Sequence, residues 1–325
     1  MGNKTDRFGF LLLPRFPHAA FASAVDALAL ANYVSGQALF EWKTVADTTI
    51  DVPAQNGIRT TIDHRLEDAP DFDTITVCGG IDGSHENSAT IRNWLRNRYS
   101  KGATIGSIST GSWVLARAGL LQKKRCTVHW EDLNAFREIF PTLNATSEIF
   151  EIDGRVFTCS GGSASVDLFL SFIAVRHGMN LAMSVSEQLV HGPARSTHEH
   201  QRLELRDRTG ISNPILARAA KIMEAHIEHP LSLEKIAQNL GVSGRQVERL
   251  FRKYFGQTPR AYYRSIRLTH ARSLLRSTDV SIQQVAYATG FCTSSYLSKC
   301  YKNEFGHLPS RERGERNLVR HINHN

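Results

Sequence analysis

The sequence lacks long apolar stretches, paired cysteines and a signal-type N-terminus. Its richest apolar runs, Phe8–Leu13 and Leu168–Val175, fall short of the ~18–20 residues that a membrane helix needs. The first run ends at Pro14, too early for the core of a signal peptide. The 5 cysteines are odd in number and show no Cys-x-x-Cys spacing. We therefore expect a reduced, cytoplasmic protein with no membrane partner, no metal and no cofactor.

Length and charge indicate two domains with different partners. A chain of 325 residues exceeds the usual size of a single core, and 41% hydrophobic with 22% charged residues excludes general disorder. The net charge of +8 is unevenly distributed. Residues 210–325 hold 18 Lys and Arg against 8 Asp and Glu, whereas residues 1–209 hold 21 against 23. This asymmetry favours a polyanion partner for the C-terminal domain only.

Short β-rich runs alternate with helical patterns over the first 190 residues, which predicts an α/β sandwich with a mostly parallel sheet. The expected strands are Phe8–Leu13, Phe72–Cys78, Ala103–Ile108 and Val156–Cys159. The expected helices are Ala19–Tyr33, Ile91–Tyr99, Gly111–Ala118, Val166–His177 and Leu181–His191. Ligands of such sheets bind beyond the carboxyl ends of the strands, which points to the loops at residues 14–18, 79–84 and 109–112.

The loop from Gly106 to Gly111 is typical of a nucleophile elbow, a tight turn from a strand into a helix. Ser109 stands at its apex, where a side chain projects into a pocket. Several motifs around it resemble the PfpI-type, class I glutamine amidotransferase-like domain, with its flavodoxin-like sheet. They are Asp26–Asn32, Cys78–Gly80, Ser109–Gly111, Ala116–Leu121, Thr127–Trp130 and Gly161–Leu168.

The resemblance implies a catalytic cysteine at the apex, supported by a histidine and a carboxylate. Here the corresponding residues are Ser109, His129 and Asp26. A serine hydroxyl needs a well-aligned base, whereas a thiol of lowered pKa is itself nucleophilic. We therefore interpret the elbow as a degenerate catalytic site kept as a ligand pocket, with no catalytic residue. The alternatives are a hydrolase or amidase acting through Ser109 and His129, or a small turn residue at Ser109 without function.

The predicted pocket combines groups suited to both ends of a zwitterion. Aromatic faces beside a carboxylate suit a cationic or quaternary ammonium group, and N–H groups at a helix start suit a carboxylate. We therefore expect an amino-acid or betaine-like effector, although each tryptophan is also typical of a core. We expect Cys78 and Cys159 to be inert buried thiols, Cys78 being the nearer to the pocket. The predicted ligand-binding residues are Asp26, Gly80, Ser109, Thr110, Gly111, Trp113, His129 and Trp130.

Residues 191–212 differ from both flanks and predict a linker. They contain Gly192-Pro193, three histidines and mixed charges. The segment His198-Glu199-His200 leaves a metal site open as an alternative. Its two imidazoles lie on the same side only if the segment is a strand, however, and no further cluster of metal ligands is evident. A solvated linker or charged helix is the favoured interpretation.

The C-terminal part contains a helix-turn-helix pattern. Asn213-Pro214 predicts the start of a helix that runs to about Glu228. A second helix ends at Gly241, and a third begins after Ser243, for which Ser243 and Gln246 form a capping-box pattern. The third helix carries apolar residues on one face and basic residues on the other, as a recognition helix does.

The same unit recurs about fifty residues later. Ser281–Phe291 repeats Ser232–Val242 at an offset of 49, while Phe305-Gly306 repeats Phe255-Gly256 at an offset of 50. This difference predicts a second turn one residue longer than the first. A long basic helix, Pro259–Ser277, is expected between the copies.

This arrangement resembles the AraC/XylS-type DNA-binding domain over residues 213–313. The resemblance implies two recognition helices in successive major-groove segments, ~10–10.5 base pairs apart. The arginines suit guanine edges, whereas the second helix suits phosphates. The alternative is a basic bundle that binds no nucleic acid. The predicted DNA-binding residues are Ser243, Arg245, Gln246, Arg249, Arg252, Ser294, Ser295, Tyr296, Lys299 and Lys302.

Together the two resemblances are those of GlxA-type transcriptional regulators. They predict a sensing domain at 1–190, a linker at 191–212, a DNA-binding domain at 213–313 and a tail at 314–325. The resemblance implies a cytoplasmic regulator or activator whose partners are promoter DNA, a small-molecule effector, a second copy in a homodimer and RNA polymerase. A DNA-binding protein that responds to no ligand is a further alternative.

Overall fold

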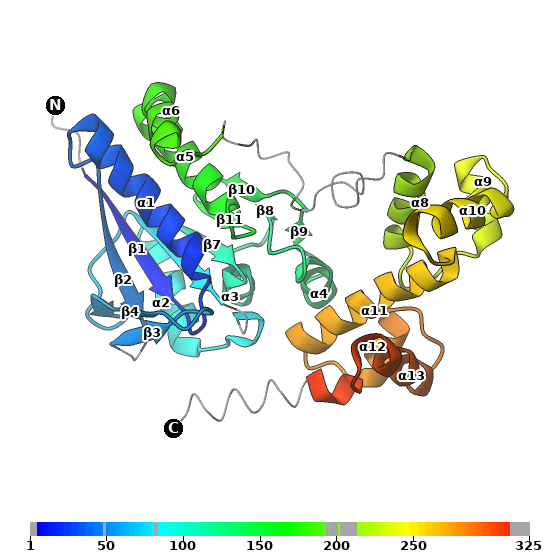
Figure 1. Cartoon of the computed structure of the whole chain (residues 1–325). Coiled ribbons are helices and arrows are strands. Elements are labelled where there is room, and N and C mark those ends of the chain that lie inside the picture. Colours follow the sequence, from blue (N-terminus) through cyan, green and yellow to red (C-terminus); the bar gives the residue numbers. More distant parts are fainter. Residues whose placement is uncertain are drawn as a thin grey trace. The chain divides into compact units, whose positions relative to one another are not determined.

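The computed structural model describes residues 5–47, 50–80, 83–192, 195, 201 and 213–312 (Figure 1). The chain divides into two compact units, unit 1 with residues 1–201 and unit 2 with residues 202–325. This division falls inside the segment that the sequence assigns to the linker. Within the described ranges, no helix is long and apolar enough to cross a membrane.

Unit 1 is built on a seven-stranded sheet with the order β10-β11-β7-β6-β1-β2-β5. All neighbouring strands in this sheet are parallel except β10 and β11, so the predicted α/β class is confirmed. Strand β2 is not among the strands expected from the sequence, because exposed Glu41 and Lys43 interrupt its apolar pattern. The strands of this sheet are β1 (Asp6–Leu12), β2 (Phe40–Ala46), β5 (His64–Arg65), β6 (Thr74–Gly79), β7 (Thr104–Ser109), β10 (Phe150–Asp153) and β11 (Val156–Cys159).

Two small sheets and seven helical segments complete the described part of unit 1. The small sheets pair β3 (Asp51–Pro53) with β4 (Arg59–Thr61), and β8 (Arg125–Cys126) with β9 (Asn144–Ala145). The last predicted helix is shorter than expected, because α6 ends at Gln188 rather than His191. The helices are α1 (His18–Ser35), η1 (Gly83–His85), α2 (Ala89–Ser100), α3 (Gly111–Arg117), α4 (Leu133–Ile139), α5 (Ala164–His177) and α6 (Met179–Gln188).

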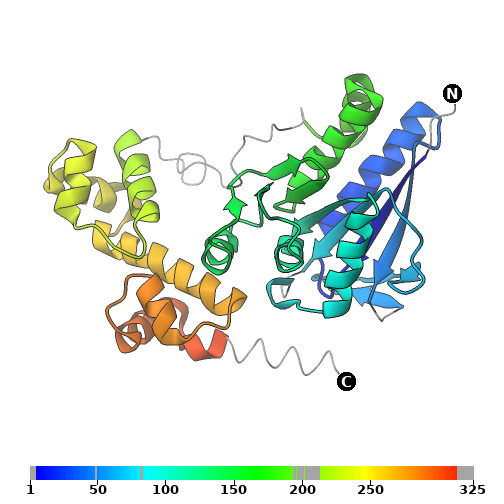
Figure 2. The same ribbon diagram turned by 180° about the vertical axis from the view of Figure 1, so that it is seen from behind.

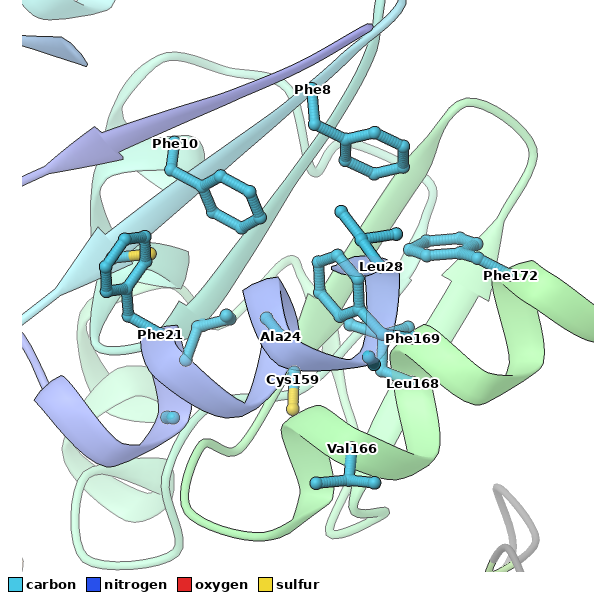
Figure 3. Packing of buried hydrophobic residues seen from close by; sticks show 14 of the residues in the cluster. Phe8, Phe10, Phe21, Ala24, Leu28, Cys159, Val166, Leu168, Phe169 and Phe172 are labelled. Carbon is cyan, nitrogen blue, oxygen red and sulfur yellow. The ribbon is translucent and has the colours of Figure 1, made fainter. Parts of the chain in front are cut away.

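The main core of unit 1 lies between the sheet and the helices α1, α5 and α6. Phe8 and Phe10 of β1 point from the sheet toward Phe169 of α5, and each ring centroid lies 5.9 Å from that of Phe169 (Figure 3). Small residues such as Ala24 let α1 approach α5 closely. Helices α2 and α3 cover the opposite face of the sheet (Figure 2). Because helices cover both faces of the sheet, we expect the site at the edge where the parallel strands have their carboxyl ends.

All the secondary-structure elements in the described part of unit 2 are helices. Asn213 caps the first helix as predicted, but that helix ends at Ala225, before the expected Glu228. Ser243 accepts a hydrogen bond from the Gln246 backbone N–H, whereas the complete, reciprocal capping box occurs at Ser281 and Gln284. The helices are α8 (Pro214–Ala225), α9 (Leu233–Leu240), α10 (Gly244–Phe255), α11 (Pro259–Ser277), α12 (Ile282–Ala288) and α13 (Ser294–Phe305).

The burial pattern confirms the internal duplication. Equivalent positions of the two copies are buried alike, and the two helices of each copy pack against each other, α9 against α10 and α12 against α13. The N-cap of α10 is Ser243 and that of α13 is Thr293, so the second turn carries the expected extra residue. The equivalent buried pairs include Ile236 and Val285, Ala237 and Ala286, Val247 and Leu297, and Phe251 and Tyr301.

Candidate effector site and nucleic-acid interface

The elbow between β7 and α3 has the tight geometry that the sequence predicts. Ser109 is the last residue of β7, and its φ of 58° lies in the left-handed region, which is unusual for a residue other than glycine. Its side chain is half-buried, and its hydroxyl forms no hydrogen bond with any residue that the structure describes. Gly79 lies against the elbow so closely that a Cβ there would collide with the backbone of Gly111.

Loops from three parallel strands meet around Ser109. The Thr110 hydroxyl donates a hydrogen bond to the Gly80 carbonyl, which joins the end of β6 to the elbow. A Cβ built on Gly161, just after β11, would lie 3.0 Å from the Ser109 Cβ. The structure therefore brings Gly80, Ser109, Thr110 and Gly111 together at the carboxyl edge of the sheet. Their ligand-binding role stays a prediction.

His129 and Asp26 do not complete a catalytic triad with Ser109. Among the described residues, neither makes a hydrogen bond to Ser109; Asp26 is exposed on α1. The Nδ1 atom of His129 accepts a hydrogen bond from the Glu131 backbone N–H at 3.4 Å and lies 4.0 Å from the Glu131 carboxylate. A triad needs a histidine within hydrogen-bond reach of the nucleophile, so this arrangement does not favour the hydrolase alternative. The ligand roles of Asp26, His129 and half-buried Trp130 remain predictions.

Trp113 belongs to the packed interior. Its side chain is fully buried, and its ring meets those of Phe136 and Phe140 edge-on, with centroids 5.1 and 5.7 Å away. The structure thus favours the alternative interpretation of this tryptophan, a core residue, over an aromatic face presented to a ligand.

The buried cysteines of unit 1 are poor nucleophiles. Burial raises the pKa of the Cys126 and Cys159 thiols to about 12, and it raises that of Cys78 still further. Inert thiols were expected at Cys78 and Cys159. Cys78 and Cys159 are both fully buried in the same core cluster, and which of them lies nearer to the pocket stays a prediction.

No metal centre is found in the part of the chain that the structure describes, where no three metal-binding side chains gather. The segment His198-Glu199-His200, for which the sequence left a metal site open, lies outside the described residues.

Helix α10 presents a basic face opposite its buried one. Val247, Leu250 and Phe251 are buried in the first apolar cluster of unit 2. The predicted DNA-binding residues of this helix lie on the other side: Arg245, Arg249 and Arg252 are exposed, Gln246 is half-buried, and the exposed Ser243 uses its hydroxyl as the N-cap.

Helix α13 repeats this division with a weaker positive charge. Leu297 and Tyr301 are buried, and the Tyr296 ring packs 5.8 Å from that of Phe291 while staying 44% exposed. The other predicted DNA-binding residues are Ser295, Lys299 and Lys302, all exposed, and Ser294, which is half-buried.

The long basic helix expected at Pro259–Ser277 is α11, and several of its arginines make contacts within unit 2. Arg267 donates hydrogen bonds to the Thr289 and Gly290 carbonyls. Arg272 and Arg276 donate to the buried carboxylate of Glu312, at 2.7 and 2.8 Å. These arginines hold the second helix-turn-helix on α11. No local pattern in the sequence predicts this role of Glu312, because its partners Arg276 and Arg272 lie 36 and 40 residues away.

Comparison with known proteins gives two family matches and full-length relatives. The DJ-1/PfpI family matches residues 15–175, and a helix-turn-helix domain matches residues 236–315. The HTH-type transcriptional regulator CdhR of Pseudomonas aeruginosa is 43% identical over 306 residues, covering 94% of this chain and 91% of that protein. The HTH-type transcriptional regulator GlxA of Rhizobium meliloti is 36% identical over 304 residues, covering 93% and 94%.

A solved structure shares part of the fold. The crystal structure of an AraC family transcriptional regulator from Pseudomonas putida covers 57% of this chain and 99% of its own, with a TM-score of 0.52 and 24% identity.

Proposed function

This chain belongs to the GlxA-type HTH transcriptional regulators, and on that premise we propose that unit 1 senses a small metabolite while unit 2 binds promoter DNA. It is a regulator rather than an enzyme, as are the relatives that span nearly the whole chain. We place the effector at the Ser109 elbow and expect an amino-acid or betaine-like compound. We also propose that the protein is cytoplasmic, forms a homodimer and contacts RNA polymerase.

The DNA-binding proposal rests on one observation, the pairing of two capped helices that each bury one face and expose a polar or basic one. In α10, Arg245 and Arg249 are exposed and hold no described ion pair, so their guanidinium groups are available to guanine edges. In α13, Lys299 and Lys302 suit phosphate contacts. We expect the two helices to read major-groove segments about one helical turn apart, ~10–10.5 base pairs.

The effector proposal rests on the Ser109 hydroxyl. The Ser109 side chain is partly exposed, its backbone φ lies in the strained left-handed region, and its hydroxyl has no hydrogen-bond partner among the described residues. Strained residues persist mainly where the surrounding structure fixes them for a function. Binding at the elbow would favour one arrangement of the two units over another and so change DNA affinity.

Two measurements test these proposals. Selection from random DNA duplexes with the full chain should enrich a sequence with two separated half-sites; enrichment of none would contradict the DNA-binding proposal. Calorimetry across amino acids and betaines should find a ligand whose affinity falls in Ser109→Ala but not in Ser100→Ala, a control at the exposed end of α2.

Turnover of an amide or ester that Ser109→Ala abolishes would instead favour an enzyme. DNA binding that no metabolite alters would favour a regulator without an effector.

A further inference from the structure

Arg195 lies in the predicted linker, residues 191–212, called here the interdomain segment, and is bound to a buried carboxylate of helix α5. Its backbone N–H donates to Asp167 Oδ1 at 2.7 Å, and its Nε and Nη2 donate to Oδ2 at 3.1 and 2.8 Å. Its Nη2 also donates to the Ser163 hydroxyl at 2.9 Å. The Asp167 side chain is 0% exposed, and His191 Nε2 lies 3.2 Å from its Oδ1. A buried carboxylate requires such partners, and here the interdomain segment supplies them.

Gln201 binds unit 1 at a second place. Its side-chain Nε2 lies 2.8 Å from Thr127 Oγ1, 2.9 Å from the Val128 carbonyl and 3.0 Å from the Glu148 carbonyl. Its backbone N–H donates to the Ser147 carbonyl at 3.2 Å. The NH2 group of the Gln201 side chain suits this set, because the three atoms that it contacts are all oxygens that can accept a hydrogen bond.

Both places adjoin loops that contact the elbow. Gly161, two residues before Ser163, lies against Ser109. On the other side, the Ser112 hydroxyl donates to the Thr127 carbonyl at 2.6 Å and lies 2.8 Å from the Ser107 hydroxyl of β7. A displacement of the elbow therefore reaches the two binding places through direct packing and hydrogen bonds.

We propose that Asp167 and the oxygen set of Thr127, Val128 and Glu148 form a docking surface for the interdomain segment, and that this surface couples the Ser109 elbow to unit 2. The coupling rests on the proposed sensing function, whereas the docking does not. An effector that moves the Gly161 loop weakens the docking of Arg195; by reciprocity, release of Arg195 changes effector affinity.

Docking limits how far unit 2 can lie from unit 1. From Gln201 to Asn213, the cap of α8, the chain advances 12 residues, whereas from Gly192 it advances 21. At ~3.5 Å per extended residue, the largest possible span is about 42 Å with Gln201 docked and about 74 Å without either contact. The docking surface thus restricts the positions that the recognition helices can take.

Distance measurement between spin labels in the full chain tests the docking. Cys292 is the one exposed cysteine of the five and takes one label, and Lys101→Cys, at an exposed position after α2, takes the other. Gln201→Glu should extend the distance distribution to longer values, because the segment is then held only at Arg195, 18 residues before Asn213. Arg195→Ala added to Gln201→Glu should extend it further. Gln37→Glu makes the same charge change at an exposed position of unit 1 and should leave the distribution as it is.

Two glycine variants test the coupling without any ligand. Gly161 and Gly162 both have positive φ, at 93° and 58°, but only a Cβ on Gly161 meets Ser109, whereas one on Gly162 meets nothing within 4 Å. In the Gln201→Glu background, where Arg195 alone holds the segment, Gly161→Ala should therefore broaden the distribution and Gly162→Ala should not. Equal distributions in Gly161→Ala and Gly162→Ala would overturn the coupling.

Unchanged distributions in both Gln201→Glu and the double variant Arg195→Ala/Gln201→Glu would overturn the docking itself. Tryptophan fluorescence reports whether each variant keeps the fold of unit 1; where the double variant does not, Gln201→Glu decides. Because no effector or operator is used, these outcomes are independent of whether the proposed sensing function holds.

Discussion

Removal of the Glu312 carboxylate should destabilise unit 2 and leave unit 1 unaffected. This carboxylate accepts hydrogen bonds from Arg272, Arg276 and the Tyr301 hydroxyl, and its side chain is only 3% exposed. It thereby joins α11 and α13 to the chain that follows them. Glu312→Ala breaks all three bonds at once.

The cost can be worked out from the burial of each partner. The fully buried Tyr301 hydroxyl loses its acceptor, which costs about 1–3 kcal/mol. The side chains of Arg272 and Arg276 are 33% and 54% exposed and regain water, so their ion pairs add about 1 kcal/mol rather than the 3–5 kcal/mol of a fully buried pair. We therefore expect a loss of about 2–4 kcal/mol, or on the order of 1–2 M in the urea midpoint.

Two spectroscopic signals separate the units in one experiment. All 4 tryptophans, at positions 42, 94, 113 and 130, lie in unit 1, so their fluorescence follows that unit alone. Far-UV circular dichroism also follows the helices of unit 2. Glu312→Ala should lower the midpoint of the unfolding of unit 2, which circular dichroism detects and tryptophan fluorescence does not. The control Glu304→Ala removes an exposed carboxylate from α13 and should change stability by no more than ~0.5 kcal/mol.

An unshifted dichroism transition in Glu312→Ala would refute the reasoning, as would an equal shift of the fluorescence transition. The wild-type protein offers a pH test of the same contact. Burial alone would raise the pKa of Glu312, but the bonds from Arg276, Tyr301 and Arg272 hold it below its ordinary value. The contact therefore stabilises unit 2 above the unfolded-state pKa, and this contribution is lost as the pH falls through the lower folded-state pKa.

Three further outcomes are expected. Arg249→Ala should weaken binding to a selected DNA site by about 1–3 kcal/mol and relax the preference at one base pair; equal weakening on every sequence, measured by gel shift, would make Arg249 a phosphate contact. Arg260 is exposed on α11, so Arg260→Ala should lower the slope of the logarithm of DNA affinity against the logarithm of salt concentration by about 1 if this residue contacts a phosphate. The Arg267 side chain is engaged within unit 2, so Arg267→Ala should lower the stability of unit 2 instead. Under native conditions a maleimide should label Cys292 and spare Cys78, Cys126, Cys159 and Cys300, which are buried; mass spectrometry showing two or more labels per folded chain would contradict this burial.

The sequence by itself determined the elements whose signals are local. The capping side chains Asn213 and Ser243 each bond a backbone N–H two or three residues away, so their positions in the sequence suffice to locate the helix starts. The duplication was readable for the same reason, because each copy carries its own apolar spacing and turn glycine. The elbow at Ser109 was likewise marked by its flanking glycines.

Only the tertiary structure decided which side chains face the solvent and which bind other parts of the fold. Trp113 became a core residue and Arg272 an internal ligand of Glu312 through contacts between residues distant in sequence. Arg195 was read as part of a solvated linker, yet it binds Asp167, 28 residues earlier in the chain. Such pairings leave no periodic trace, because the partner of a charge is set by how elements pack and not by its neighbours in the sequence.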